Sequence, residues 1–455
     1  MEMLPDMGRL QPQARELEEA VLGALMLEKD AYSIVSEILK PECFYEKAHE
    51  KIYAAIVDLA LSQRPVDMLT VTEQLKKRGE LEDVGGPFYI SQLTSKVASS
   101  AHIEYHARII AQKYLARELI SFTAMIQGKA FDETLDVEDL MQEAEGKLFE
   151  ISQRNVKKDV TQINPVIKDA MEMLQKAALQ KEGLSGLRTG FEGLDKMTSG
   201  WQNSDLIIIA ARPAMGKTAF VLSMAKNMAV NFNTPVALFS LEMSNVQLVN
   251  RLIVNVCEIP GEKIKSGRLE SYEWEQLDFK IKELYDAPIF VDDSPSLSVF
   301  ELRTKARRLV REHGIKIIII DYLQLMNASG MSFGSREQEV STISRSLKGL
   351  AKELNIPIIA LSQLNRGVEA RQGAEGKRPQ LADLRESGAI EQDADMVCFI
   401  HRPEYYKITE DERGNSLIGL AEIIIAKHRN GPTRQIELAF ERNINAFYNY
   451  ENQNG

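Results

Sequence analysis

Apolar residues in the first 150 positions recur at the spacing of amphipathic helices. In LEEAVLGALM the apolar positions share one helical face, and IEYHARIIAQKYLARELISF repeats the pattern with Ile103, Ala107, Ile110, Ala111 and Tyr114. The GGP at 85–87 predicts a turn between helices. This region has no metal-ligand spacing, nucleophile constellation or phosphate loop. We therefore predict an all-α packing or interaction domain over residues 1–153.

A polar stretch follows, and then one isolated helix. Asn164 can cap it, Pro165 suits its first turn and Gly183 can end it. Its apolar stripe cannot be buried on itself, so the helix must dock elsewhere. Docking on its own domains is the simpler interpretation, and docking on a neighbouring subunit is the alternative. We predict a helical linker over residues 154–186.

From residue 187 the pattern changes to short apolar runs that alternate with helices, which is typical of a parallel sheet with crossover helices. The strand-like runs are LIIIAA (206–211), VALFSL (236–241), PIFV (288–291), IKIIII (315–320), IPIIAL (356–361) and MVCFIH (396–401). Their nearly continuous apolarity indicates that both faces of the sheet are covered. Ser298 and Glu301 predict the start of a helix that stops near Gly314, and Asn430-Gly431 predicts a hairpin. Residues 187–455 are thus predicted to form an α/β domain.

Composition narrows the class of protein. Hydrophobic residues make up 44% and charged residues 27% of the 455 residues, which is typical of a soluble globular chain. No apolar run approaches the roughly 20 residues that cross a bilayer, so we expect no membrane partner. Three distant cysteines argue against a disulfide framework and favour the cytoplasm. The formal net charge of -11 requires that any nucleic-acid site be local.

The segment ARPAMGKT (211–218) joins a predicted strand to an amphipathic helix, which is the context of a phosphate-binding loop. Gly216 lets the backbone wrap phosphates, Lys217 can span the β- and γ-phosphates, and the Thr218 hydroxyl can hold Mg²⁺. Ala211 stands where such loops usually begin with glycine. We predict that ATP binds along the turn, at Ala214, Met215, Gly216, Lys217, Thr218 and Ala219.

Three polar residues follow other predicted strands, and ligands gather at the carboxyl ends of parallel strands. Asp321 can orient Mg²⁺, although a strand-end aspartate that makes a turn is the competing interpretation. Glu242 can act as a general base, or merely precede a helix capped by Ser244. Gln363 can bind the γ-phosphate, or be a solvated loop residue. The pairing with the phosphate loop favours the functional interpretation.

Basic residues near this sheet are candidates for nucleic acid and for a neighbour's nucleotide. The loop at 366–379 combines glycines with four cations, and DLRESGAIEQDAD carries Arg385 beside Gly388, where backbone can approach a ligand closely. Lys427 and Arg429 project beside the hairpin turn. A basic hairpin tip is usually only solvated, but an arginine supplied by another subunit can stabilise phosphoryl transfer.

The motifs ARPAMGKT, SLEMS, IIIIDYLQLM, SREQEVSTISRSLK, IALSQLNR, DLRESGAIEQDAD and AKHRNGP together resemble the bacterial replicative DNA helicases of the DnaB type. The resemblance extends over nearly the whole chain, through LEEAVLGALM, PVDMLTV and DVGG. It implies a RecA-like P-loop ATPase domain with a parallel-core sheet, a hexameric ring, and 5′ to 3′ movement on single-stranded DNA.

The resemblance also implies roles for particular residues. Lys217 and Thr218 contact nucleotide and Mg²⁺, Glu242 is the catalytic base, Asp321 serves the metal and Gln363 senses the γ-phosphate. Arg429 and Lys427 reach the neighbour's nucleotide, while the single-strand contacts fall on Arg385, Glu386 and Gly388. The linker helix docks on the adjacent subunit, the N-terminal domains pair and receive primase, and a helicase loader places the ring on DNA.

The sequence therefore predicts an ATP-driven, homohexameric replicative DNA helicase that acts at the replication fork. A RecA-like recombinase or a ring ATPase that does not unwind is the alternative enzyme. A nucleotide-gated scaffold that recruits primase is an alternative from a different class; it predicts a slow ATPase that ignores single-stranded DNA.

Overall fold

The computed structural model describes residues 10–95, 102–153, 184–328, 333–373, 375–411 and 413–450, with the isolated positions 167 and 171. The chain forms two compact units, Met1–Lys158 and Asp159–Gly455, and each is considered by itself. The predicted linker helix between Asn164 and Gly183 lies almost entirely outside the described residues.

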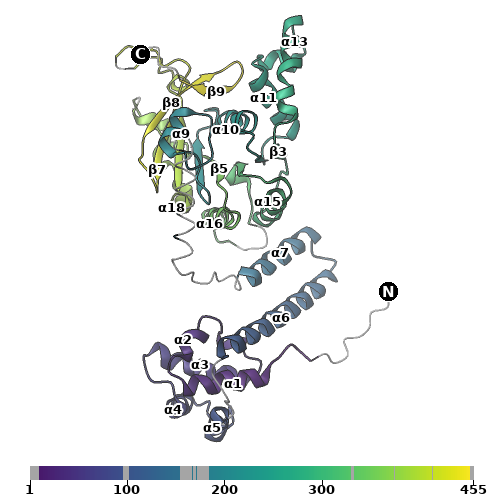
Figure 1. Ribbon diagram of the computed structural model, residues 1–455, viewed down its shortest axis with the longest axis vertical. Helices are drawn as coiled ribbons and strands as arrows, with labels where there is room; N and C mark the ends of the chain where they lie inside the picture. Colours follow the sequence, from purple (N-terminus) through teal and green to yellow (C-terminus); the bar gives the residue numbers. More distant parts are fainter. Residues whose placement is uncertain are drawn as a thin grey trace. The chain divides into compact units, whose positions relative to one another are not determined.

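The first unit is helical, as the periodicity predicts (Figure 1). Its elements are α1 (Arg15–Leu27), α2 (Ala31–Val35), η1 (Pro41–Cys43), α3 (Lys47–Leu61), α4 (Met68–Arg78), α5 (Gly86–Ser95), α6 (Ile103–Ala130) and α7 (Val137–Gln153). The apolar face predicted for the first helix, including Val21, Leu22 and Leu25, is buried in one core. On α6 the buried residues of that core end at Ile110, with Ala111 and Tyr114 packed against them, and α6 also contacts α7.

The second unit is built on one nine-stranded sheet of order β3-β2-β4-β5-β1-β6-β7-β8-β9. From β3 to β6 in this order the strands are parallel, and β7, β8 and β9 continue the sheet antiparallel. The strands are β1 (Leu206–Ala211), β2 (Val236–Ser240), β3 (Ile289–Asp292), β4 (Ile317–Asp321), β5 (Ile358–Gln363), β6 (Met396–His401), β7 (Leu420–His428), β8 (Gln435–Glu441) and β9 (Ala446–Asn449).

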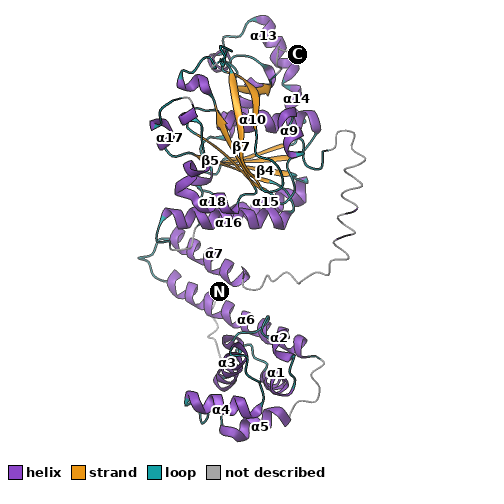
Figure 2. Cartoon of the chain, turned by 90° about the vertical axis from the view of Figure 1, so that its left-hand side faces the viewer, coloured by secondary structure: helices purple, strands orange, loops and turns teal. Residues whose placement is uncertain are grey.

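Helices cover both faces of this sheet, as the apolar runs predict (Figure 2). Along β1, Ile207 and Ile209 pack into one core with α9 (Glu192–Thr198), α10 (Lys217–Lys226) and α11 (Asn245–Cys257). Leu206 and Ile208 pack into the other with α15 (Val299–His313), α16 (Arg336–Leu354) and α18 (Gly388–Asp393). Alternate side chains of a strand point to opposite faces, so a strand buried on both sides needs an unbroken apolar run.

The remaining elements connect this framework. They are η2 (Asn227–Asn231), α12 (Gly261–Ser266), α13 (Ser271–Lys280), α14 (Lys282–Tyr285), η3 (Leu323–Leu325), α17 (Gly367–Ala370), η4 (Glu375–Lys377), η5 (Leu381–Ser387) and η6 (Pro403–Tyr406). The helix predicted from Ser298 begins as expected, because the Ser298 side chain accepts from the Glu301 amide, and Gly314 ends it in a left-handed conformation.

Among the described residues, no helix has both the length and the apolar character that crossing a bilayer requires.

Candidate nucleotide site

The turn between β1 and α10 has the backbone of a phosphate-binding loop. Gly216 has a φ of 94°, and a Cβ at this position would stand 3.1 Å from Cε2 of Phe447. Ala214 also takes a positive φ, of 64°, which costs a non-glycine residue about 1 kcal/mol. Met215 and Ala219 are buried and anchor the turn, and α10 begins at Lys217. The first amides of a helix lack partners within it, so the start of α10 is suited to bind an anion.

Lys217 lies across the carboxyl end of β5. Its Nζ donates to the Ser362 carbonyl oxygen at 3.2 Å and lies 5.3 Å from the centre of the Tyr322 ring. Burial lowers the pKa of Lys217, and the negative charges of Asp321 and Glu242 oppose that effect. An anion bound in the turn would give this half-buried ammonium a stronger partner than a carbonyl.

Thr218 and Asp321 are in direct contact. The Thr218 Oγ1 donates to Oδ2 of Asp321 at 2.7 Å. Asp321 is 1% exposed, and burial raises the pKa of its carboxyl while the Thr218 hydrogen bond and Lys217 lower it. Its Oδ1 is buried without a hydrogen-bond partner in the described part of the chain. A buried carboxylate oxygen with no partner, beside a threonine hydroxyl, fits a water of a bound Mg²⁺.

Glu242 and Gln363 complete this edge of the sheet. Glu242 follows β2 by two residues, and the Leu241 amide donates to the Asp321 carbonyl oxygen at 2.7 Å, so the ends of β2 and β4 are adjacent. Gln363 ends β5 opposite Ala211 of the loop. Both side chains are exposed, and the predicted cap of α11 is formed by Ser244. The residues predicted from four separate segments thus meet at the carboxyl end of the parallel strands.

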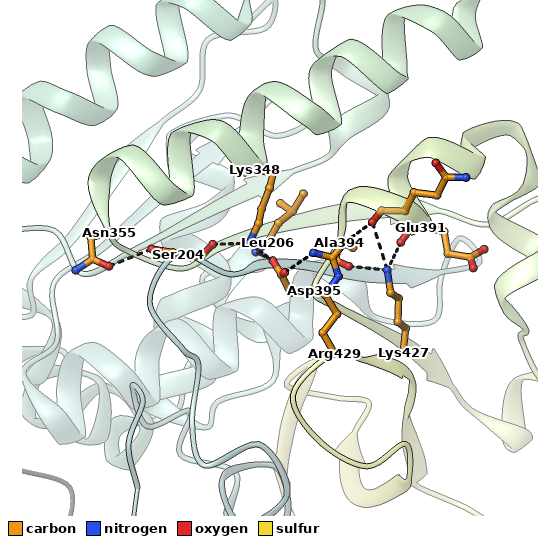
Figure 3. A network of polar contacts seen from close by, with 10 residues as sticks. Ser204, Leu206, Lys348, Asn355, Glu391, Ala394, Asp395, Lys427 and Arg429 are labelled. Atoms are coloured by element: carbon orange, nitrogen blue, oxygen red, sulfur yellow. Dashed lines mark hydrogen bonds and ion pairs between the residues drawn. The ribbon is translucent and has the colours of Figure 1, made fainter. Parts of the chain in front are cut away.

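Lys427 and Arg429 lie near the amino end of β1, where Figure 3 shows them beside Asp395 and Leu206. The Arg429 amide donates to the Asp395 carbonyl oxygen at 2.9 Å, and the Asp395 amide donates to Leu206, the first residue of β1. The phosphate loop follows Ala211, the last residue of β1. The six residues of β1 are separated by five steps of about 3.3 Å, so the two ends of the strand lie about 17 Å apart. The structure therefore does not bring these two cations to the chain's own phosphate loop.

The DNA-contact candidates lie where η5 meets α18. Arg385 and Glu386 are in η5, and their side chains lie outside the description; Gly388 begins α18 and is exposed. The nearby loop at 366–379 is less available than its charge suggests. Arg371 pairs with Asp383, and Arg378 binds Oε2 of Glu422 at 2.9 Å. These cations hold the loop to its own subunit.

Comparison with known proteins places this arrangement in a family. The family model of the DnaB-like helicase C terminal domain matches residues 186–449, and that of the DnaB-like helicase N terminal domain matches residues 10–112. The chain is 45% identical to the replicative DNA helicase DnaB of Geobacillus stearothermophilus, over 97% of this chain and 96% of that protein. It is 44% identical to the replicative DNA helicase DnaC of Bacillus subtilis, with the same coverage.

The chain belongs to the DnaB-like replicative helicases. It is an ATP-dependent DNA helicase with a RecA-like C-terminal domain, and the predicted fold class is confirmed. A solved DnaB-like replicative helicase, described with its interactions with primase, aligns at a TM-score of 0.70 and 35% identity over 96% of this chain and 100% of that one. A second solved structure, of an ATPase domain, aligns at a TM-score of 0.59 and 40% identity, over 64% of this chain and 100% of that one.

Two arginines at the phosphate loop of this helicase were missed by sequence reasoning. Arg212 is buried, and its guanidinium binds the Leu364 carbonyl oxygen at 2.7 Å and Glu369 at 2.8 Å. Arg402 stacks 3.7 Å from the centre of the Phe440 ring and donates to the Ala214 carbonyl oxygen at 3.4 Å. Each follows a strand at the same edge, which is the signal that could have found them.

Proposed function

We propose that this helicase works as a homohexameric ring that moves 5′ to 3′ on single-stranded DNA and separates the duplex at the replication fork. The proposal rests on the separation, within one subunit, of the phosphate loop from the two cations Lys427 and Arg429. The phosphate loop follows the carboxyl end of β1, and Lys427 and Arg429 lie near its amino end. Head-to-tail packing of subunits brings opposite ends of the strands together, and such packing forms a ring when the rotation between subunits closes.

Within one subunit we assign ATP to the turn from Ala214 to Ala219. Lys217 binds the β- and γ-phosphates. Thr218 would hold Mg²⁺ through its hydroxyl, and Asp321 would hold it through a water. The metal, when bound, neutralises charge that develops on the transferred phosphate. The unpartnered Oδ1 of Asp321 supports this assignment. Glu242 takes the proton of the attacking water, and Gln363 senses the γ-phosphate.

Arg429, with Lys427, acts on the nucleotide of the adjacent subunit in this proposal. A guanidinium placed on the γ-phosphate stabilises the charge of the transition state and accounts for about 10³- to 10⁵-fold in rate in related phosphoryl transfers. The Arg429 side chain is 45% exposed, so one side of it remains open to a neighbour.

Single-stranded DNA is assigned to the segment with Arg385, Glu386 and Gly388. The net charge of -11 opposes binding of DNA through a general basic surface, whereas contacts inside a ring channel need only local positive charge. Backbone contacts grip phosphates without reading bases, which suits a motor that must pass over any sequence.

The N-terminal unit is assigned to ring assembly and to primase. The α6–α7 pair and the turn between these helices expose large apolar side chains, among them Phe131, Val137 and Met141, which supports pairing between N-terminal domains. We also propose that a helicase loader places the ring on DNA and that the protein works at the nucleoid in the cytoplasm. The proposed domains are residues 1–153, 154–186 and 187–455.

Mixed rings test the central claim. Neither Lys217→Ala nor Arg429→Ala rings should hydrolyse ATP at more than a few per cent of the wild-type rate. In an equal mixture, about a quarter of the interfaces join an intact loop to an intact Arg429, so ATPase should recover above both parents. The control is Arg311→Ala, an arginine of α15 whose side chain is 81% exposed.

Failure of every mixture to exceed its parents would show that Arg429 does not act between subunits. Unwinding is then measured on a forked duplex. Wild-type rings that hydrolyse ATP on single-stranded DNA without displacing a strand would favour the recombinase-like alternative. An ATPase unaffected by both single-stranded DNA and Glu242→Ala would favour the scaffold.

A further inference from the structure

The end of α18 binds Lys427. The Lys427 Nζ donates to the carbonyl oxygens of Glu391 at 2.6 Å and Ala394 at 2.8 Å, and reaches that of Gln392 at 3.4 Å (Figure 3). The last carbonyls of a helix lack partners within the helix and attract cations. Lys427 therefore ties β7 to the carboxyl end of α18.

Arg429 is held at the same place from two sides. Its amide donates to the Asp395 carbonyl oxygen at 2.9 Å, and its Nη1 donates to Oδ1 of Asp395 at 3.1 Å. Its Nη2 donates to the Gln392 carbonyl oxygen. These bonds fix both the backbone and the guanidinium, while nearly half of the side chain stays exposed.

Asp395 is itself fixed to the framework of the domain. It is 5% exposed, and its Oδ2 accepts the Leu206 amide at 2.9 Å and the ammonium of Lys348 on α16. The two carboxylate oxygens therefore divide their contacts: Oδ2 binds the sheet and α16, and Oδ1 binds Arg429. A group anchored in this way can hold a second side chain in one orientation.

We propose that Asp395 is the positioning residue of Arg429, which it holds in the orientation that meets the neighbouring subunit's nucleotide. The inference rests on the proposed function, because it requires that Arg429 act between subunits. A flexible arginine on a hairpin loses rotamer freedom when it binds, and a carboxylate that holds it beforehand removes part of that cost. Misplacement by about 1 Å can cost about 10²-fold in rate.

The competing explanation is that Asp395 only supports the fold through Lys348. Two substitutions separate the explanations in the full-length ring. In Asp395→Asn the side-chain oxygen can still accept the Leu206 amide, but the amide nitrogen then faces Arg429 as a second donor. In Lys348→Gln the contact between Asp395 and Arg429 remains, while the ammonium contacts of α16 with Asp395 and with the Ser204 carbonyl oxygen are lost.

We expect Asp395→Asn to lower kcat for ATP at least tenfold with KM changed less than twofold, since the phosphate loop is untouched. Lys348→Gln should keep kcat within twofold. Ring assembly, measured by size-exclusion chromatography, should be intact in both. If Asp395→Asn does not assemble, Asp395→Glu retains the charge but shifts the carboxylate. A wild-type kcat in assembled Asp395→Asn, or in Asp395→Glu where only that variant assembles, would overturn the inference.

A double-mutant cycle with Arg429→Gln gives the decisive readout. If Asp395 acts through Arg429, Asp395→Asn should change kcat less than twofold in the Arg429→Gln background. A further tenfold loss there would show a merely structural role and overturn this inference alone. If Arg429→Gln by itself left kcat unchanged, the assignment of Arg429 between subunits would fail, and this inference with it.

Discussion

Replacing Asp205 by asparagine should stabilise the ATPase domain, by an amount that depends on pH. Asp205 is 9% exposed, and burial together with the like charge of Asp395 raises its pKa from 3.8 to about 6, against the opposing effect of Lys348 and Arg429. Because the folded-state pKa is the higher one, the folded protein binds this proton more tightly than the unfolded chain does. Ionisation of Asp205 therefore costs stability as the pH rises from about 4 to 6.

The size of the effect follows from the two pKa values. At pH 5 the ionised carboxylate lowers the free energy of unfolding by about 1.5 kcal/mol, and at pH 7.5 by about 3 kcal/mol. Asparagine has the same shape and no charge. Asp205→Asn should thus gain about 3 kcal/mol at pH 7.5, or about 5 to 10 °C in Tm for a domain of this size, and about half of that at pH 5.

Tryptophan fluorescence can follow this domain alone, because the chain has two tryptophans, and both Trp201 and Trp274 belong to the second unit. Urea unfolding at pH 5.0 and 7.5 would compare wild type, Asp205→Asn and the control Asp278→Asn. Asp278 lies on the surface of α13, and we expect its replacement to change stability by less than about 0.5 kcal/mol. A gain from Asp205→Asn that is equal at the two pH values, or a loss at pH 7.5, would refute the electrostatic reasoning.

Three further predictions concern the sites. A Cβ added at Gly388 meets no atom within 4 Å, and the φ there is -52°, which is α-helical. The free energy of unfolding of Gly388→Ala, from thermal melts, should therefore be unchanged or higher by up to about 1 kcal/mol. Its affinity for labelled oligo-dT in anisotropy should fall at least fivefold; unchanged affinity would remove Gly388 from the DNA contacts. Gly216→Ala should abolish binding of a fluorescent ATP analogue, because φ is 94° and Phe447 is 3.1 Å away; a normal Kd would contradict the role of this turn. Glu242→Gln should bind that analogue normally but lose about 10²- to 10⁴-fold in kcat, and a kcat within tenfold of wild type would exclude it as the base.

Local sequence patterns predicted most of the framework. Near-continuous apolar runs located the central strands because both faces of a parallel sheet are buried, and Ser298 with Gly314 marked both ends of α15. The nucleotide residues were predictable for a related reason. Once a phosphate loop follows one parallel strand, polar residues that follow the others must lie at the same edge.

Contacts between distant segments could not be predicted in this way. The sequence of the loop at 366–379 suggested free cations, but Arg371 and Arg378 find partners in η5 and on β7. The short strand β9 was missed because Ala446–Asn449 shows no long apolar run and acquires its role by pairing with β8. Arg402 likewise owes its position to a contact with Phe440. This residue lies on β8, in the antiparallel part of the sheet, and the apolar runs do not predict the order of those strands.

The segment from Asp383 to Asp395 runs from the carboxyl end of the parallel strands to their amino end. At one end, the Asp383 carbonyl oxygen accepts the Asn365 amide at 3.2 Å, two residues after Gln363 and beside the chain's own phosphate loop. At the other end, Asp395 binds Arg429, and Gly388 lies between. If these residues act as proposed, a shift of α18 on DNA would reach the Arg429 guanidinium through the Gln392 carbonyl oxygen, while Asp395 stays anchored to β1 and α16. A rigid connection of this kind would couple hydrolysis around the ring to the position of the strand without any contact between the two ligands.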